Sequence, residues 1–554
     1  MRVRTRRAAA LSAASCLALA LPTGVAAASA HAQPGPPSRH VLLLSVDGLH
    51  ASDLSWYVRT HPTSAMAALV GSGMTYRQAL TQFPSDSFPG LVGQVTGGDP
   101  KTTGIYYDVS YNHALLPPGT VNCTTAKPGT MVPFDESIDR DSSRLDAGQG
   151  LASLPRDILQ MTPTPQSLLD PAALPVDPAT CRPVYPSDYL KVNTIFDVAH
   201  QRGLRTAWSD KHPAYDILNG PSGVGVDDLF TPEIDSTADA AGNSWTDVNS
   251  LTQRYDGYKV RAVVNQIDGL DHSGDRKVGV PAIFGMNFQS VSTAEKLPES
   301  GGQPGGYNAD GTPGPVLRSS LSFVDRSLAT MRTELARAHL AGSTTIILSA
   351  KHAQSPIDKS SLKRIDDSTV LAALDTAWQR AGHHGTLVAG SLNDDGMLLW
   401  LNDRSATATS FAQRFLLSYS GNGTGAHGRA KATDINGAPV AYRNGGLRAV
   451  FAGTAAAQFI GVHPGDSRVP DLIGLVQHGV VYTGKTSKIA EHGGDDPQDR
   501  HVALVVAGAS VHHGTWSGTV STIQIAPTIL SLLGIPTRSL QAVRRQHTAV
   551  LHGA

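Results

Sequence analysis

A chain of 554 residues is long enough for roughly three or four domains, or for one large α/β domain with insertions. Its formal net charge is −1, only 16% of its residues are charged, and its 55 glycines and 35 prolines indicate many loops. Residues 1–32 contain four Arg and no acidic residue, so the remainder carries a charge of about −5. This mildly acidic balance argues against nucleic-acid binding as the main function.

The N-terminus has the pattern of a secretory signal. Basic residues up to Arg7 precede the apolar run Ala8–Leu21, and small residues follow it. We therefore expect residues 1–32 to be removed and the protein to be secreted, with Arg6 next to Arg7 as a hint of twin-arginine export. Cys16 has no lipobox around it, so no lipid anchor is expected. No later stretch is apolar for long enough to span a bilayer.

A turn at Thr81–Gly90 follows the strand-like run Met74–Leu80 and precedes a short helix expected over Gly90–Gly97. Pro89 suits the first turn of a helix, which places Ser87 at or just before the N-cap. Backbone N–H groups and the positive end of the helix dipole face such a hydroxyl, so it favours an anion and an alkoxide. A phosphoryl-transfer nucleophile needs this setting. An ordinary N-capping serine is the alternative interpretation.

Carboxylate and imidazole side chains adjoin three further strand-like runs. Asp47 follows His40–Val46, Lys351 and His352 follow Ser343–Ala350, and Glu491 and His492 precede His501–Ala507. Groups of this kind, collected at the strand ends of an α/β sheet, are what a catalytic metal site uses.

These pieces resemble the alkaline phosphatase superfamily, and its type I phosphodiesterase/nucleotide pyrophosphatase family is the branch they resemble most. The matching pieces are Ser45–Gly48, Phe83–Pro89, Thr103–Ile105, Ser349–His352, Glu491–Gly493 and the closing run Ile523–Pro536. They span about Val41 to Pro536. The resemblance implies an α/β fold, an alkaline-phosphatase-like three-layer sandwich with a mostly parallel central sheet.

Two insertions are expected in this α/β core. The expected parts are a core of residues 38–353 and 488–540, a loop-rich insertion at about 109–190 and a cap of residues 354–487 that narrows substrate choice. The first insertion contains Cys123 and Cys181, which are expected to form a disulfide in an oxidising compartment.

The resemblance also implies a mechanism. Ser87 would attack phosphorus in line and form a covalent phosphoserine, which water then cleaves. Divalent ions, expected to be zinc in one or two copies, would activate the nucleophile and stabilise the leaving group. The resemblance assigns Asp47, Ser87 and His352 to the nucleophile-side metal and His492 to the other.

The sequence departs from the family pattern at two metal-ligand positions. Lys351 stands where the family has Asp, and its ammonium is expected to replace a cation or to form a structural ion pair with Asp47. Asn287 or Gln289 stands where the family has Asp followed four residues later by His. Asp268 and His272 have the Asp-x-x-x-His spacing, but they precede the strand-like run Val278–Met286, whereas the family's ligands follow the strand. One retained metal, a rebuilt metal site and no metal are therefore all open.

Further candidate substrate contacts follow from position. Asp108 stands near the place of a phosphoryl-binding Asn in the family, and an ionised Asp would repel an anion there. A protonated Asp, an extra cation, another substrate or a plain loop acid would each account for an Asp at this position. Asp210, Lys211 and His212 follow a strand-like run, where they would contact a phosphate or leaving group, or form a solvated loop.

The expected function is an exported hydrolase of phosphate mono- or diesters, acting on a small-molecule phosphate ester or a nucleotide. Tyr106, Tyr107 and Tyr215 would stack on a nucleobase or pack in the core. The alternatives are an anion-binding relic of the same fold without turnover, and a hydrolase of sulfuryl or phosphonate groups. The sequence does not indicate an oligomeric state.

Overall fold

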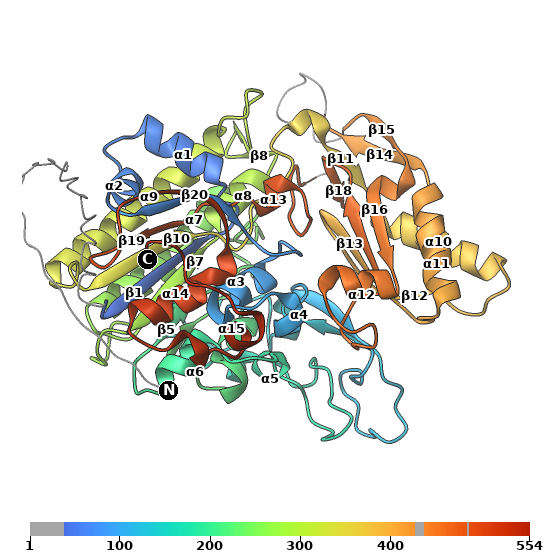
Figure 1. The fold of residues 1–554 in the computed structure, drawn as a ribbon, viewed down its shortest axis with the longest axis horizontal. Helices are drawn as coiled ribbons and strands as arrows, with labels where there is room; N and C mark the ends of the chain where they lie inside the picture. The colour runs from blue at the N-terminus through green and yellow to red at the C-terminus, as the bar shows by residue number, and fades with distance from the viewer. Residues whose placement is uncertain (1–37, 427–436, 485–486) are drawn as a thin grey trace, which may run out of the picture. The chain divides into compact units, whose positions relative to one another are not determined.

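A large mixed sheet forms the centre of the computed structural model, which describes residues 38–426, 437–484 and 487–554. The predicted signal, residues 1–32, lies outside these ranges. The strands of the sheet are β1 (His40–Val46), β2 (Met74–Leu80), β5 (Ala207–Ser209), β6 (Asp228–Phe230), β7 (Ile283–Phe288), β10 (Thr344–Ser349), β19 (Val505–Ala507) and β20 (Gly514–Ser521). Their order is β20-β2-β19-β10-β1-β7-β5-β6 (Figure 1). Only β19 runs antiparallel to its neighbours.

The central strands are apolar runs because helices cover both faces of the sheet. Six of the seven residues of β1 are buried, as are all residues of β7 and β10. Ser45 of β1 lies opposite Ser349 of β10 and Asn287 of β7. This parallel register brings the segments that follow the three strands to one edge of the sheet.

The helices form two layers. One contains α1 (Ala51–Thr60), α2 (Ala65–Ser72), α7 (Asn249–Ile267), α8 (Ser290–Lys296) and α9 (Pro315–Arg337). The other contains α3 (Ser87–Thr96), α4 (Pro100–Thr103), α6 (Ile195–His200), α14 (Ile525–Leu532) and α15 (Gln541–Gln546) (Figure 1). The predicted three-layer α/β class with a mostly parallel sheet is confirmed.

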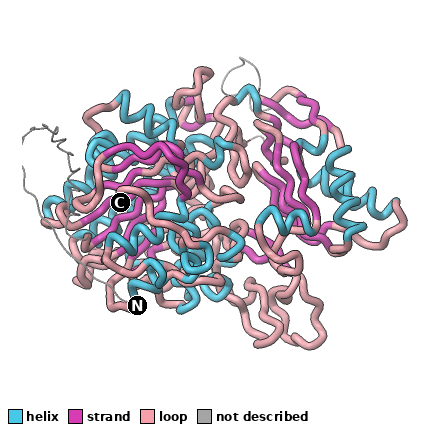
Figure 2. Tube along the Cα trace, in the orientation of Figure 1, coloured by secondary structure: helices cyan, strands magenta, loops and turns pink. Residues whose placement is uncertain are grey.

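The loop-rich insertion contains one short hairpin, β3 (Val109–Asn112) with β4 (Thr130–Pro133), and the short helix α5 (Pro186–Tyr189). Much of the rest is loop, drawn in pink in Figure 2. Cys123 and Cys181 form a disulfide with their Cα atoms 5.8 Å apart, which confirms the predicted pairing.

Two further four-stranded sheets lie between residues 363 and 482. The first has the order β15 (Pro439–Tyr442), β14 (Gly421–Gly425), β11 (Lys363–Ile365), β18 (Val480–Tyr482). The second has the order β12 (Val388–Asn393), β13 (Gly396–Leu401), β17 (Leu472–Val476), β16 (Leu447–Ala452). Helices α10 (Asp367–Arg380), α11 (Ala406–Ser418) and α12 (Thr454–Ile460) accompany them. A separate hydrophobic cluster fills this segment. The role of residues 354–487 as a cap stays a prediction.

Short elements complete the fold. They are α13 (Pro497–Arg500), the hairpin of β8 (Glu299–Ser300) and β9 (Gln303–Pro304), and the 3₁₀ helices η1 (Glu136–Ile138), η2 (Ile158–Gln160), η3 (Pro165–Leu168), η4 (Pro213–Ser222), η5 (Lys359–Ser361), η6 (Asn444–Gly446), η7 (Thr522–Gln524) and η8 (Thr537–Ser539). No helix among the described residues is both long and apolar enough to cross a membrane.

Candidate active site

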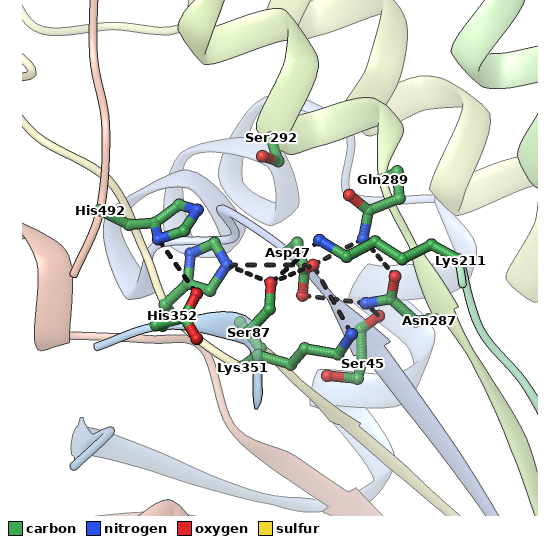
Figure 3. Close-up of polar contacts among 12 residues, drawn as sticks. Ser45, Asp47, Ser87, Lys211, Asn287, Gln289, Ser292, Lys351, His352 and His492 are labelled. Carbon is green, nitrogen blue, oxygen red and sulfur yellow. Dashed lines mark hydrogen bonds and ion pairs between the residues drawn. The ribbon is translucent and has the colours of Figure 1, made fainter. Parts of the chain in front are cut away.

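Polar side chains converge at the edge of the sheet where the parallel strands β1, β5, β7 and β10 end. Asp47 follows β1, Lys211 follows β5, Gln289 follows β7, and Lys351 with His352 follows β10. Figure 3 shows these side chains pointing toward one another around Ser87. The carboxyl ends of parallel strands are where α/β proteins place their ligands, so the fold itself assembles this group.

Ser87 is the first residue of helix α3. Asp86 is the N-cap, and its carboxylate accepts a hydrogen bond of 3.1 Å from the backbone N–H of Phe88. The expected helix therefore begins earlier than residue 90, because Asp86 caps it and Pro89 fits its first turn. Ser87 lies one residue after the N-cap and not at or before it as expected, but its hydroxyl still lies at the positive end of the α3 dipole.

Three groups surround the hydroxyl of Ser87. Lys211 Nζ donates a hydrogen bond of 3.1 Å to Ser87 Oγ, which itself lies 3.2 Å from His352 Nε2 and 3.4 Å from Asp47 Oδ2. His352 Nδ1 lies 3.1 Å from the carbonyl oxygen of Ala353 and donates to it. This tautomer leaves Nε2 as an acceptor for the Ser87 proton. Burial lowers the pKa of His352 to about 3, so the ring is neutral at physiological pH.

Amide groups occupy both oxygens of the Asp47 carboxylate. Asn287 Nδ2 donates to Asp47 Oδ1 at 2.9 Å, and Gln289 Nε2 donates to Oδ2 at 2.6 Å. Burial acts to raise the pKa of Asp47, but the nearby Lys351, His352 and Lys211, with the Gln289 hydrogen bond, lower it to about 2. Asp47 is therefore ionised and hydrogen-bonded.

The two lysines have different partners. Lys351 Nζ donates to Asp210 Oδ1 at 3.0 Å and to Tyr215 Oη at 2.7 Å, and it lies 3.8 Å from Asp47 Oδ2. Burial lowers the pKa of Lys351. Burial also acts to lower the pKa of Lys211, but Asp47, Asp210 and other carboxylates outweigh it and raise that pKa. Lys211 is thus the charged ammonium that contacts Ser87.

His492 lies beside His352, with the ring centroids 3.8 Å apart. Its Nδ1 has no hydrogen-bond partner among the described residues and lies 3.8 Å from Asp86 Oδ2. Burial, together with the nearby His352, lowers the pKa of His492 well below its usual value. Both imidazoles are therefore neutral and close enough to serve one site.

Ser87 opens into a cavity of about 350 Å³. The lining is mostly polar and includes Asp108, Lys211, His212, Gln289 and His492, but no aromatic side chain other than histidine. Burial, with a contribution from the carboxylate of Asp86, raises the pKa of Asp108 to about 8. The Asp108 carboxyl group is therefore mainly protonated at pH 7. This matches one of the explanations left open by the sequence.

Some expected contacts lie elsewhere. Tyr106, Tyr107 and Tyr215 are buried and do not line the cavity, so they pack rather than face a ligand. His272 is held by Asp228 at 2.5 Å, and the neighbouring candidate Asp268 pairs with Arg337. Neither residue of this Asp-x-x-x-His pair lines the cavity of Ser87.

Sequence reasoning missed two features of the cavity wall. Lys296, at the end of α8, pairs with Glu491 at 2.8 Å, and Lys488 pairs with the same carboxylate. No motif surrounds Lys296, so nothing in the sequence singled it out. Lys211 was expected to meet substrate, and the sequence did not indicate its contact with Ser87.

The donors around Ser87 do not fit the metal centre that the resemblance implies. Two ammonium groups, those of Lys211 and Lys351, lie beside Ser87 and Asp47, and amide N–H groups take both oxygens of Asp47. A divalent cation there would be repelled and would find few free lone pairs. Among the described residues, two other clusters bring three possible ligand atoms within 4.8 Å of one another: His50 with Asp53 and Glu295, and Glu136 with His212 and Asp235.

Comparison with known proteins agrees with this architecture. The family model described as "Type I phosphodiesterase / nucleotide pyrophosphatase" matches residues 41–138. The chain has no match among curated protein sequences. The solved structure of alkaline phosphatase PafA has a TM-score of 0.57 at 12% identity, over 91% of this chain and 97% of PafA. Murine ectonucleotide pyrophosphatase/phosphodiesterase 5 has a TM-score of 0.50 at 12% identity, over 90% of this chain and 96% of its own.

An inactive variant of the murine protein, solved in complex with AMP, has the same TM-score of 0.50. At this level of identity the structural similarity shows the fold. The resemblance predicted from the sequence, to the alkaline phosphatase superfamily and to its type I phosphodiesterase/nucleotide pyrophosphatase-like branch, is confirmed.

Proposed function

We propose that this chain, with its alkaline phosphatase fold, hydrolyses phosphate esters and uses Ser87 as the nucleophile. The observation that carries the proposal is the position of the Ser87 hydroxyl. It lies at the N-terminus of α3, within reach of one ammonium, one carboxylate and one neutral imidazole, and it opens into a cavity. A nucleophile beside a proton acceptor and a positive charge is the arrangement that covalent phosphoryl transfer requires.

In the first step, Ser87 Oγ forms a bond to phosphorus while the bond from phosphorus to the leaving oxygen breaks. The Ser87 proton passes by way of His352 Nε2, the neutral acceptor 3.2 Å away, to the leaving oxygen. Water then attacks the phosphoserine: its oxygen bonds to phosphorus as the Oγ–P bond breaks, one water proton returns by way of His352 to Ser87 Oγ, and the phosphate product leaves. Lys211 and the N-terminus of α3 stabilise negative charge on the transferring group throughout.

The ammonium groups take the place of metal charge in this proposal. Lys211 neutralises charge on Ser87 Oγ, and Lys351, held by Asp210 and Tyr215, adds positive charge behind Asp47. Protonated Asp108 can donate a hydrogen bond to a phosphoryl oxygen without repelling the anion. No step requires a zinc ion bound by Asp47, His352 and His492.

Two features bear on where the protein acts and on what substrate. The signal-like residues 1–32 and the disulfide Cys123–Cys181 support export to an oxidising compartment. The charged lining of the cavity supports a small polar phosphate ester as the substrate. The AMP bound to the murine relative makes nucleotides one group to be tested.

A binding protein of the same fold, without turnover, is the second candidate. The replacement of metal ligands by Lys351, Asn287 and Gln289 favours this candidate. The two amides donate hydrogen bonds to the Asp47 carboxylate, and Lys351 pairs with it, so the carboxylate has partners without any ion. Hydrolysis of sulfuryl or phosphonate esters would use the same nucleophile and the same cavity.

Turnover of p-nitrophenyl phosphate and bis-p-nitrophenyl phosphate distinguishes these candidates. We expect the wild type to hydrolyse at least one of them, and Ser87→Ala to abolish turnover without lowering thermal stability. Ser292→Ala is the matched control, since Ser292 lines the same cavity but its hydroxyl donates to Gln354 Oε1 at 2.6 Å. Unchanged turnover in Ser87→Ala would remove Ser87 as the nucleophile. Absence of turnover in the wild type, with retained phosphate binding, would favour the binding protein.

A further inference from the structure

A second chemical group lines the cavity of Ser87. Glu136 of η1, His212 after β5 and Asp235 after β6 each offer one ligand atom, and these atoms lie within 4.8 Å of one another. All three residues line the same cavity as Ser87. None of them belongs to the set that the family resemblance assigned to metal.

His212 has the orientation of a metal ligand. Its Nδ1 lies 2.9 Å from both carboxylate oxygens of Glu233 and donates a hydrogen bond to them. Its Nε2 therefore keeps a lone pair, and it makes no hydrogen bond within the described part of the chain, although the side chain is only 6% exposed. A carboxylate that orients a histidine in this way is the usual support of a metal-binding imidazole.

The carboxylates of this group have no basic partner among the residues that the structure describes. Within residues 38–426, 437–484 and 487–554, no Lys or Arg forms an ion pair with Glu136 or Asp235. A bound cation would pair with these two carboxylates.

The other cluster of this kind already has its partners. Tyr307 Oη lies 2.6–2.8 Å from His50, Asp53 and Glu295, and His50 Nε2 lies 2.9 Å from the carbonyl oxygen of Gln354. These side chains form a closed, buried hydrogen-bond network. The cluster of Glu136, His212 and Asp235 differs because it has an unpartnered nitrogen, an exposed carboxylate on Asp235 and an open cavity.

We propose that Glu136, His212 and Asp235 bind one divalent transition-metal ion, Zn²⁺ or Mn²⁺, with Glu233 orienting His212. One imidazole nitrogen with two carboxylates suits these ions better than Mg²⁺ or Ca²⁺, which prefer oxygen ligands alone. The three protein ligands leave open coordination positions toward the cavity. That the ion also contacts the substrate rests on the proposed function; metal binding itself does not.

Calorimetric titration of the chelator-treated full-length protein with Zn²⁺ or Mn²⁺ tests this site. We expect about one ion per chain in the wild type and at least a 100-fold weaker affinity in Asp235→Asn and in His212→Gln. Asp235 is exposed, so its variant keeps the test valid if His212→Gln does not fold. Asp247→Asn is the matched control, because Asp247 is also an exposed carboxylate of this cavity and should leave binding unchanged.

Ser87→Ala and Asp47→Asn separate this site from the nucleophile. Both variants should bind the ion with wild-type affinity. Loss of the ion in either of them would move the metal to the strand ends and overturn the proposal, as would wild-type affinity in Asp235→Asn and His212→Gln, or no binding by the wild type. These results are independent of turnover, so a failure of the proposed function would be seen separately, in the activity of Ser87→Ala.

Discussion

Lys211 changes the chemistry expected of Ser87. The family resemblance implied a metal ion next to the hydroxyl, although the sequence left the number of metal ions open; the structure places the Lys211 ammonium 3.1 Å from Ser87 Oγ. Nearby carboxylates raise the pKa of this lysine despite its burial, so the ammonium is charged over the whole physiological range. A fixed positive charge next to a developing alkoxide or phosphoryl anion stabilises it.

Replacing Lys211 by Met keeps most of the side-chain volume and removes the charge. We expect kcat for p-nitrophenyl phosphate esters to fall about 10²- to 10³-fold, the usual loss for one donor to a developing anion. Lys488→Met is the control, because Lys488 lines the cavity but pairs with Glu491. A kcat in Lys211→Met equal to that of the wild type would show that this ammonium does not take part.

Asp108 should set the alkaline limit of activity. Its pKa of about 8 means that the carboxyl is protonated below this pH and repels an anionic ester above it. We therefore expect kcat/KM to fall as pH rises through about 8, and Asp108→Asn to remove this decline, since an amide does not ionise. A pH–rate profile of both proteins tests this. The same alkaline decline in Asp108→Asn would assign it to another group.

The sequence predicted the residues of the site better than their contacts. Asp47, Ser87, His352 and His492 were expected together because strand ends meet at one edge of the sheet, and the structure places them there. Sequence spacing does not give the direction of a long flexible side chain. Lys351, expected near Asp47 or the substrate, lies closer to Asp210, while Lys211 from β5 reaches Ser87.

At the scale of elements, helix α3 determines where the nucleophile lies. A Cβ atom added at Gly90 would lie 2.5 Å from the carbonyl oxygen of Lys351, so only glycine permits the helix to approach the end of β10 this closely. This approach holds Ser87 against His352, which follows β10. The close approach of α3 to Lys351, just after β10, is therefore part of the geometry of the candidate site.

Gly90→Ala should push α3 away from the end of β10. We expect a loss of about 1–3 kcal/mol in the free energy of unfolding, as for other overpacked sites, and a large fall in kcat as Ser87 moves. Gly71→Ala is the matched control, because Gly71 is also helical, in α2, and an added Cβ meets nothing within 4 Å. Denaturant unfolding measures the stability of both variants, and turnover assays measure their kcat. Gly90→Ala with wild-type stability and kcat would contradict this interpretation.

Apolar periodicity predicted the strands well where the strand pairing is regular. The runs His40–Val46 and Met74–Leu80 are strands with the expected bounds. The strand expected over residues 501–507 covers only Val505–Ala507, because His501 and Val502 form isolated bridges to Leu80 and His50. Such irregular pairing depends on neighbours that are distant in the sequence, so local patterns do not show it.

At the scale of the whole molecule, several carboxyl groups among the described residues are buried where desolvation favours their protonated form. Burial raises the pKa of Glu295 to about 7 and that of Asp394 to about 8, and it raises that of Asp499 well above its usual value. Such groups bind a proton more tightly in the folded state than in the unfolded state. Their stabilising effect is complete below the unfolded pKa and is lost as pH rises through the folded pKa.

We therefore expect the melting temperature to fall between pH 7 and pH 9. The histidines whose pKa is lowered titrate below this range, so they do not contribute to the fall. Asp499→Asn should reduce this decline, by up to about 1.4 kcal/mol of unfolding free energy per pH unit. Thermal unfolding at several pH values measures both effects. A melting temperature that is constant or rises from pH 7 to pH 9 would contradict the expectation.

The most direct test of the central claim is to trap the covalent intermediate. The wild-type protein, quenched with acid during turnover of bis-p-nitrophenyl phosphate, should carry the transferred phosphoryl group on the peptide that contains Ser87, as detected by mass spectrometry. Ser87→Ala, treated in the same way, should carry none. Continued product formation with Ser87 unmodified at every quench time, or with the group on another residue, would contradict the account.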